Sequence, residues 1–235
     1  GVIRNRHGFR LHEKDVIAAL APMSFVILVL EYYGALSSGG CVHIVAEDVR
    51  KDVRMIEDYF AQNGITCAFI SPQILRFFKN KAATLEKVST GSERVSKLLG
   101  DGYDLYNFYG CSETAAMAAS YKIEEAMENT PIGKPAEGLE FFLLDEAGQE
   151  VADGEEGEIC IKGILAEAYL NLEEQSACTF QGQEDGEILL HTGDIAKRLA
   201  DGNYVYVNRK DWMVKINGQR VETGEIELKM ASVAN

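Results

Sequence analysis

The stretch LYNFYGCSETAA, residues Leu105–Ala116, decides how the first half of the chain is organised. Apolar and aromatic residues lead into Gly110, and Ser112, Glu113 and an alanine-rich run follow. This pattern predicts a buried strand, a turn and then a helix. Ligands of open α/β sheets bind at the carboxyl ends of parallel strands, so the turn is a candidate ligand site. An ordinary helix start, with Ser112 as the cap and Glu113 near the positive helix end, explains the same residues.

Short apolar runs alternate with helical stretches as far as about residue 120. Buried strands are expected at residues 15–20, 41–45, 66–70, 85–89 and 105–109. The apolar run at residues 25–36 is too short to cross a bilayer and contains Glu31, which favours a buried helix. Strands that alternate with helices predict a mostly parallel sheet flanked by helices, an α/β fold.

Two further helices are expected between these strands. Residues 49–63 place Val53, Ile56 and Phe60 on one helical face, and Gly64 ends the helix. Ser71 is a plausible cap for the next helix, with Pro72 at its first position.

From about residue 131 the sequence becomes β-rich. Turn residues at 146–148 and 153–154 separate runs of β-forming residues, and the same style returns at 201–222. We therefore expect an α/β unit at residues 1–125 and a smaller, mostly antiparallel unit at 126–210.

Composition excludes several classes of protein. The net charge of −14 argues against nucleic acid or an anionic membrane as the main partner. The five cysteines lack CxxC spacing and are expected to be reduced, mostly buried thiols of a cytoplasmic protein. Residues 1–16 have no apolar centre, so no signal peptide is expected. The histidines show no metal-binding spacing, and neither common glycine-rich nucleotide motif occurs.

Two polar residues in the β-rich part are further candidates. Asp194, in the stretch HTGD, is expected in a turn at the end of a β run, where it accepts hydrogen bonds from a pair of hydroxyls. Arg209 follows a second β run and offers a fixed fork of donors for sugar or phosphate oxygens. Taken singly, each is an ordinary turn aspartate or surface arginine.

Four motifs in order resemble the adenylate-forming enzymes, and within them the adenylation domains of nonribosomal peptide synthetases. They are NFYGCSE (Asn107–Glu113), GEICIKG (Gly157–Gly163), TGD (Thr192–Asp194) and NRKDWMVKINGQRVE from Asn208. The resemblance covers nearly the whole chain. It implies that the β-rich unit is a distorted barrel, that residues 211–235 hold a hinge at Asp211, and that the small C-terminal domain of the family is absent.

The resemblance also implies a nucleotide site for ATP. The ring of Tyr109 is expected to stack on adenine, Asp194 and Arg209 to hold the ribose, Ser112 to approach the phosphates and Glu113 to bind Mg²⁺. Ser112 and Glu113 are the expected catalytic residues. The remaining members of the nucleotide set are Gly91, Asn107, Gly110 and Tyr206.

The implied reaction is activation of a carboxylic acid as an acyl-adenylate, with release of pyrophosphate. The acyl group then passes to the phosphopantetheine thiol of a carrier protein, in the company of neighbouring synthetase domains. Alignment and charge neutralisation carry such phosphorus chemistry. The family's phosphate loop and C-terminal lysine are not found, so the chain alone is expected to be a poor catalyst.

The expected acid pocket is almost entirely apolar. Its members are Val26, Ile27, Leu30, Phe69, Val88, Thr90, Phe108, Ala116 and Met117. Val26 stands where the family normally has the aspartate that pairs with a substrate ammonium group. An ammonium group buried there would lack a counter-charge. We expect an apolar acid without a free α-amine: a keto, hydroxy, fatty or aryl acid. Alternatively, another carboxylate supplies the contact, or the alignment slips by a residue.

Two other functions remain open on sequence grounds. One is a stand-alone acyl-CoA or acyl-carrier ligase with the same chemistry. The other is a non-catalytic, adenylation-like module that binds nucleotide or a partner domain.

Overall fold

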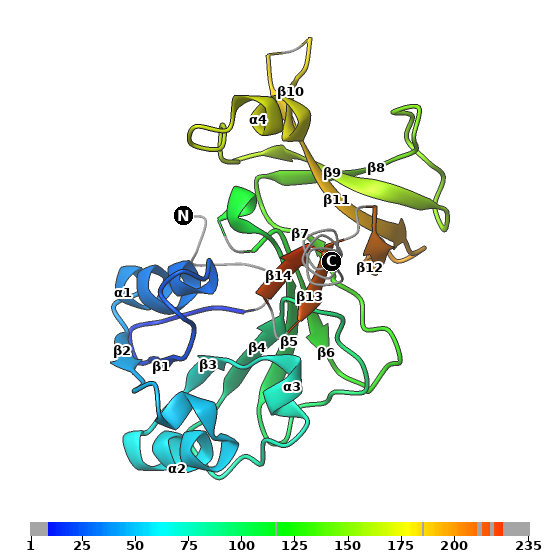
Figure 1. Ribbon diagram of the computed structural model, residues 1–235. Helices are drawn as coiled ribbons and strands as arrows, with labels where there is room; N and C mark the ends of the chain where they lie inside the picture. The colour runs from blue at the N-terminus through cyan, green and yellow to red at the C-terminus, as the bar shows by residue number, and fades with distance from the viewer. Residues whose placement is uncertain (1–8, 116, 185, 211–212, 217–218, 223–235) are drawn as a thin grey trace, which may run out of the picture.

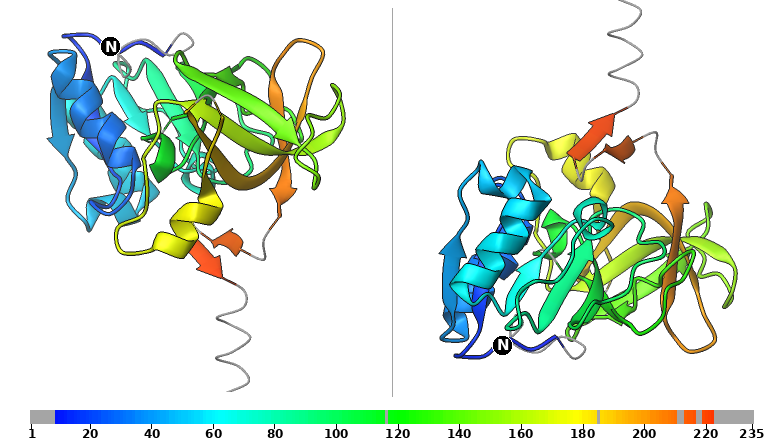
Figure 2. Two further views of the ribbon diagram at one scale, coloured as in Figure 1. Left: turned by 90° about the horizontal axis from the view of Figure 1, so that it is seen from above. Right: turned by 90° about the horizontal axis from the view of Figure 1, so that it is seen from below.

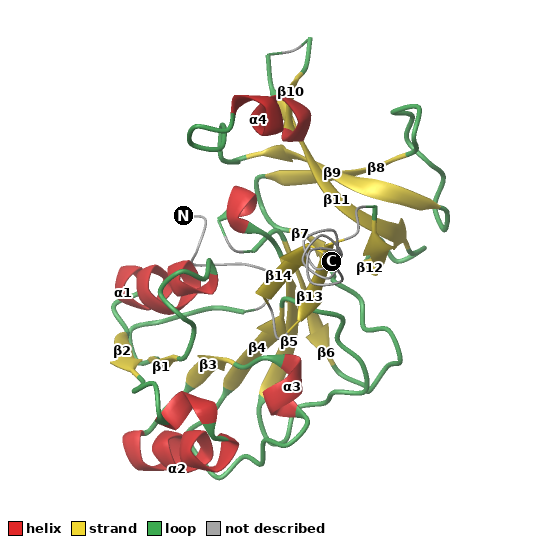
Figure 3. Ribbon diagram, in the orientation of Figure 1, coloured by secondary structure: helices red, strands yellow, loops and turns green. Residues whose placement is uncertain are grey.

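The computed structural model describes residues 9–115, 117–184, 186–210, 213–216 and 219–222. A mixed sheet with helices forms the lower part of Figure 1, and an antiparallel sheet lies above it. Figure 3 shows that helices gather mainly around the first sheet. The expected α/β part and the antiparallel β-rich part that follows it are both confirmed. The unit boundaries near residues 125 and 210 stay predictions.

The first sheet has seven strands in the order β2-β1-β3-β4-β5-β6-β7. Strands β1 to β5 pair in parallel, whereas β6 and β7 are antiparallel additions. The five expected strands are therefore confirmed, with ends that differ by a few residues. The bounds are β1 (Val16–Ala19), β2 (Cys41–Ile44), β3 (Cys67–Phe69), β4 (Lys87–Gly91), β5 (Asp104–Tyr109), β6 (Ala119–Ile123) and β7 (Lys134–Pro135).

The helices of this part are α1 (Ala35–Ser37), α2 (Val53–Asn63) and α3 (Pro72–Leu75). A π-helical segment, Val29–Gly34, runs directly into α1 and confirms the expected helix there. A 3₁₀ turn (Val49–Lys51) precedes α2, which begins later than expected because the Asp52 side chain caps it. No helix in the described part of the chain combines the length and hydropathy that crossing a bilayer needs.

Gly64 and Pro72 behave as the sequence predicts. Gly64 ends α2 with a φ of 61°, in the left-handed region where a side chain is unfavourable. Pro72 occupies the start of α3. Ser71 lies at the cap position, but its side chain makes no capping hydrogen bond.

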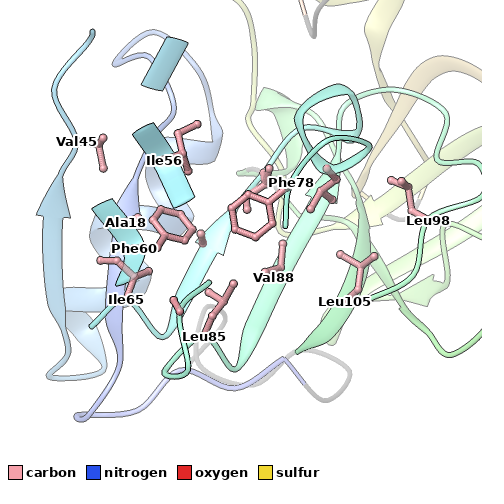
Figure 4. Packing of buried hydrophobic residues seen from close by; sticks show 14 of the residues in the cluster. Ala18, Val45, Ile56, Phe60, Ile65, Phe78, Leu85, Val88, Leu98 and Leu105 are labelled. Carbon is pink, nitrogen blue, oxygen red and sulfur yellow. The ribbon is translucent and has the colours of Figure 1, made fainter. Parts of the chain in front are cut away.

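Apolar side chains cover both faces of the first sheet. Ile56 and Phe60 of α2 pack against strand residues such as Val88 on one face. Figure 4 shows Phe60 beside Phe78, with ring centres 5.8 Å apart. Successive strand residues point to opposite faces, so Tyr106 and Phe108, two positions apart on β5, pack on the other face together with Leu30.

The second sheet contains five strands, β8 to β12, and one helix, α4, lies beside it. The order is β10-β11-β9-β8, and β12 also pairs with β11. Turns at Gly148 and Gly154 lie where the sequence predicts them. Strands β13 and β14 pair antiparallel as a separate two-stranded sheet outside the two larger ones (Figure 2). The bounds are β8 (Leu139–Leu144), β9 (Glu156–Gly163), α4 (Glu173–Thr179), β10 (Phe180–Gly182), β11 (Ile188–Arg198), β12 (Tyr204–Arg209), β13 (Met213–Ile216) and β14 (Gln219–Glu222).

The prediction of a helix after Gly110 is wrong. A single 3₁₀ turn, Ser112–Thr114, is followed by strand β6, which pairs antiparallel with β5. Ala118 and Ala119 are fully buried, and the Ala118 N–H donates to the Tyr109 carbonyl at 2.7 Å. Burial of these small side chains and pairing with β5 override the helix propensity of alanine.

The cysteines are less buried than expected. All five are free thiols. Cys67 and Cys160 are buried and Cys111 is half-buried, but Cys41 and Cys178 are exposed. The prediction of mostly buried thiols is therefore wrong for the last two, which lie on the edge strand β2 and the surface helix α4.

Gly91 is the glycine on which the central pairing depends. It ends β4 with a φ of 151°, and an added Cβ would lie 2.1 Å from the Phe108 carbonyl oxygen. Gly91→Ala is expected to lower the free energy of unfolding by about 3 kcal/mol, through backbone strain and overpacking. Gly182→Ala is the control, because nothing lies within 4 Å of its added Cβ. Urea unfolding of the intact protein measures both, and equal midpoints would contradict the prediction.

Candidate active site

Three of the expected nucleotide residues meet at the carboxyl end of β5. The Tyr109 hydroxyl donates a hydrogen bond of 2.7 Å to Oδ2 of Asp194 on β11. Nη1 of Arg209, at the end of β12, donates to Oδ1 of the same carboxylate at 2.8 Å. Burial, and then the negative charge of Asp194, raise the pKa of Tyr109 well above its usual value. The phenol therefore remains a neutral donor at physiological pH.

A bulge in β11 places Asp194 at this position. Strand β11 shifts register against β9 between His191 and Ile195, so Thr192–Asp194 leave the regular ladder. The Thr192 hydroxyl donates to the Ile159 carbonyl at 2.7 Å and accepts from the Asp194 N–H at 3.1 Å. The expectation that HTGD ends a β run in a turn is thus wrong, because β11 continues through the bulge to Arg198.

Asp194 and Arg209 are also cross-strand partners. They oppose each other in the antiparallel β11–β12 pair, so their ion pair follows from the register. Their side chains are 8% and 11% exposed. This buried pair faces Tyr109 from the second sheet and joins the two sheets at the candidate site.

The turn after β5 separates Ser112 from Glu113. Ser112 is exposed, whereas Glu113 is only 5% exposed. The Tyr169 hydroxyl donates to Oε1 of Glu113, and the Ala166 N–H donates to the Glu113 carbonyl at 2.8 Å. Cys111, rather than Ser112, occupies the cap position of the turn. The segment after β9 therefore fixes the position of Glu113.

Tyr169 is a site residue that the sequence patterns do not identify. It lies between β9 and α4, where its N–H donates to Oγ of Ser176 at 2.8 Å, and its ring packs 5.2 Å from that of Phe180. A lone tyrosine in a connecting segment carries no periodicity or motif. Only the fold brings it to Glu113, which is 56 residues away in sequence.

Three other members of the expected nucleotide set make hydrogen bonds in which one partner is a backbone group, or pair along the sheet. The Asn107 amide donates to the Pro131 carbonyl at 2.8 Å, and the Asn129 amide donates to the Tyr206 carbonyl at 3.0 Å. The segment around residues 129–131 thus links Asn107 of β5 with Tyr206 of β12. Gly91 pairs in register beside β5.

Gly110 and the ring of Tyr206 also belong to the expected nucleotide set. Gly110 follows Tyr109 directly and is half-buried. The guanidinium carbon of Arg94 lies 5.9 Å from the centre of the Tyr206 ring. Asp211, the expected hinge residue, lies outside the described residues.

The expected acid pocket is only partly assembled. Leu30, Phe108 and Met117 pack in one cluster, whereas Val88 belongs to the cluster on the other face of the sheet. Thr90 is fully buried, and its hydroxyl has no hydrogen-bond partner among the described residues.

The other pocket positions lie around this cluster. Ile27 is buried, and Val26 and Phe69 are half-buried. Phe69 and Leu30 line a small cavity of about 10 Å³, enough for about one water molecule. Ala116 lies outside the described residues.

Glu31 is a buried carboxylate beside this pocket. It lines the same cavity as Leu30 and Phe69 and is 1% exposed. Its oxygens accept backbone N–H bonds from Leu20 at 3.0 Å and Ala21 at 3.1 Å. Burial raises its pKa to about 7, and these hydrogen bonds partly offset that effect. A carboxylate within an apolar run is the sequence signal that could have identified it.

The fold and site together define the class of adenylate-forming proteins. A mixed, mostly parallel sheet presents a Tyr-Gly-Cys-Ser-Glu turn, and an Asp–Arg pair from an antiparallel sheet faces it. The chain belongs to the AMP-binding enzyme family, whose model matches residues 2–170. The resemblance inferred from the motifs is confirmed.

Relatives across most of the chain are peptide synthetases. Bacitracin synthase 1 of Bacillus licheniformis is 33% identical over 226 residues, covering 94% of this chain and 4% of that protein. Tyrocidine synthase 1 of Brevibacillus parabrevis is 32% identical over 233 residues, covering 94% and 21%. The chain therefore spans only a small part of these curated relatives.

Solved structures show the same fold. A nonribosomal peptide synthetase protein containing adenylation and PCP domains, bound to a vinylsulfonamide inhibitor, matches with a TM-score of 0.84 and 25% identity. The match covers 96% of this chain and 42% of that one. An artificially fused adenylation-PCP di-domain from Klebsiella oxytoca has a TM-score of 0.82 at 23% identity, covering 96% and 45%.

Proposed function

We propose that this chain is the core of an adenylation domain, which activates a carboxylic acid with ATP as an acyl-adenylate and releases pyrophosphate. The acyl group then passes to the phosphopantetheine thiol of a carrier protein. The observation that carries this proposal is the contact of Tyr109 and Arg209 with one buried carboxylate, Asp194. Family membership and the peptide synthetase relatives support it.

The ribose is proposed to bind at Asp194. A carboxylate offers about four acceptor positions, and Tyr109 and Arg209 each donate one hydrogen bond to it. The acceptor positions that remain suit the two vicinal hydroxyls of a ribose. The Tyr109 ring offers its face to adenine beside Gly91, with Asn107, Gly110 and Tyr206 around the base and sugar.

The phosphates are proposed to lie at the turn after β5. Ser112 is exposed there and offers a hydroxyl, and Glu113 offers a carboxylate. A carboxylate oxygen at a strand end is the ligand type that Mg²⁺ takes, so Glu113 fits the cation. Bound Mg²⁺ would supply neutralisation of phosphate charge. Tyr169 and the Ala166 N–H hold Glu113 in place for that role.

The acid substrate is proposed to be apolar and without a free α-amine. Val26 supplies no counter-charge, and leaving an ammonium group buried without one costs about 3–5 kcal/mol. Glu31 is the carboxylate that the alternative requires, because it lines a cavity with Leu30 and Phe69. Its oxygens already accept the N–H groups of Leu20 and Ala21, which favours a structural role for Glu31.

Substrate-dependent ATP–pyrophosphate exchange on the full-length parent protein tests both proposals. The panel pairs leucine, valine and phenylalanine with their 2-keto and 2-hydroxy counterparts, and adds octanoate and benzoate. We expect exchange with the amine-free acids alone. Exchange with the amino acids would retain the adenylation function but overturn the role of Val26, and Glu31→Gln would then test the ammonium partner. No exchange with any acid of the panel would contradict the proposed function.

The identity of the acyl acceptor and the binding of nucleotide distinguish the two remaining functions. Transfer of the acyl group to coenzyme A instead of a carrier domain would indicate a stand-alone ligase. A non-catalytic scaffold would show no rise in melting temperature with millimolar ATP and Mg²⁺, which ligand linkage requires of a binder. We also propose that the units divide near residues 125 and 210, that Asp211 is a hinge, and that the protein acts in the cytoplasm.

A further inference from the structure

Another buried carboxylate, Glu158, lies behind the bulge that carries Asp194. Glu158 is in β9 and is 8% exposed. Its Oε1 accepts the N–H of Gly193 at 3.0 Å, and its Oε2 accepts a bond from the Lys210 ammonium at 3.3 Å. Nδ1 of His191 lies 3.6 Å from the same Oε2.

These contacts replace the backbone hydrogen bonds between β9 and β11 that are lost at the bulge. Regular pairing of β9 with β11 joins His191 to Cys160 and then resumes only at Ile195, opposite Glu158. The residues between lack ladder partners on β9, and a buried N–H without a partner is costly. Glu158 supplies a side-chain acceptor for Gly193 where the strand cannot supply a backbone one.

The two residues bound by Glu158 are sequence neighbours of Asp194 and Arg209, the two residues proposed to bind the ribose. Gly193 precedes Asp194 and Lys210 follows Arg209. The backbone closes the arrangement, because the Lys210 N–H donates to the Gly193 carbonyl at 2.8 Å. One carboxylate therefore ties β11 and β12 together at the residues beside Asp194 and Arg209.

The charge of Glu158 suits this role. Burial would raise its pKa, but the neighbouring His191 imidazole, the hydrogen bond from the Gly193 N–H and the charge of Lys210 outweigh burial and lower it to about 2. The group is thus an anion at neutral pH. Glu158, Cys160 and His191 have ligand atoms within 4.8 Å of one another. Two features of this trio disfavour a divalent cation. The Lys210 ammonium lies beside it, and burial raises the pKa of Cys160 to about 12, so its thiol stays protonated.

We propose that Glu158 is a positioning residue of the nucleotide site, which holds Asp194 and Arg209 in register to read the ribose hydroxyls. The inference rests on the proposed function and extends it to a residue that does not touch the nucleotide. Its effect on activity is transmitted through the Gly193 N–H and the Lys210 ammonium. Loss of the carboxylate frees the bulge to move Asp194 away from the sugar.

Steady-state exchange with Glu158→Gln in the full-length protein is the test. We expect the KM for ATP to rise about tenfold, the effect of losing one charge-assisted hydrogen bond. The KM for the acid and the kcat at saturating ATP stay unchanged. The preference for ATP over analogues that lack the 2′- or 3′-hydroxyl shrinks, because Asp194 no longer meets those hydroxyls. A purely structural role would leave that preference at its wild-type value.

Matched variants separate the outcomes. Glu156 lies two residues earlier in β9, in a half-exposed pair with Lys197. The KM for ATP and the hydroxyl preference of Glu156→Gln are expected to match those of the wild type. Lys210→Met removes one of the two ties and is expected to act in the same direction, which keeps the test available if Glu158→Gln does not fold. An unchanged hydroxyl preference in both site variants would overturn the proposal. Absence of exchange in the wild type would overturn the proposed function itself.

Discussion

Glu113→Gln is expected to lower ATP–pyrophosphate exchange by about 10²- to 10³-fold, the range typical for loss of one preorganised charge-stabilising group. The change removes a negative charge but keeps the side-chain shape and an oxygen that accepts from Tyr169. The free energy of unfolding is expected to change little. The Mg²⁺ concentration for half-maximal exchange is expected to rise, because an amide is a weaker ligand for a hard cation.

Glu167→Gln provides the control for this change. Glu167 is exposed and adjoins Ala166, whose N–H donates to the Glu113 carbonyl, so it shares the neighbourhood without the buried carboxylate. Its exchange rate and Mg²⁺ dependence should equal those of the wild type. Equal rates for Glu113→Gln and Glu167→Gln would remove Glu113 from the nucleotide site.

The parallel strands and α2 were predictable because each has a strong local signal. Buried strands of a parallel sheet are continuous apolar runs, and α2 has its apolar residues at helical spacing with Gly64 at its end. The alanine-rich stretch after Gly110 misled for the opposite reason. Alanine favours a helix when nothing else acts, but antiparallel pairing of β6 with β5 decided its structure.

The candidate site shows the same division. Asp194 and Arg209 lie in recognisable motifs, so sequence could propose them, and the fold brings them to Tyr109. Tyr169 could not be assigned, because its role comes from a contact with a segment distant in sequence. Glu31 stands out in its apolar run, but its backbone N–H partners are visible only in the structure. Hydrophobic periodicity and sequence motifs indicate the role of a residue within its own segment, and not its contacts with distant segments.

Asp194→Asn is expected to lower the free energy of unfolding by about 3–5 kcal/mol, because it breaks an ion pair whose two side chains are both largely buried. The Arg209 side chain is only 11% exposed. Lys197→Gln on the same strand is the control. Its pair with Glu156 is half-exposed at 41% and 49%, and such pairs contribute about 0–1 kcal/mol. Urea unfolding of the intact protein distinguishes the two changes.

The same variant is expected to lose the rise in melting temperature that ATP and Mg²⁺ give the wild type, since stabilisation by a ligand depends on its affinity. Adding Arg209→Met to Asp194→Asn removes the second member of the broken ion pair and should recover part of the lost stability. It should not recover the response to ATP, because neither hydroxyl acceptor nor guanidinium donor is then present. Recovery of both would show that the pair serves only to join β11 and β12. Recovery of stability alone would show that one buried ion pair holds the strands together and also binds the nucleotide.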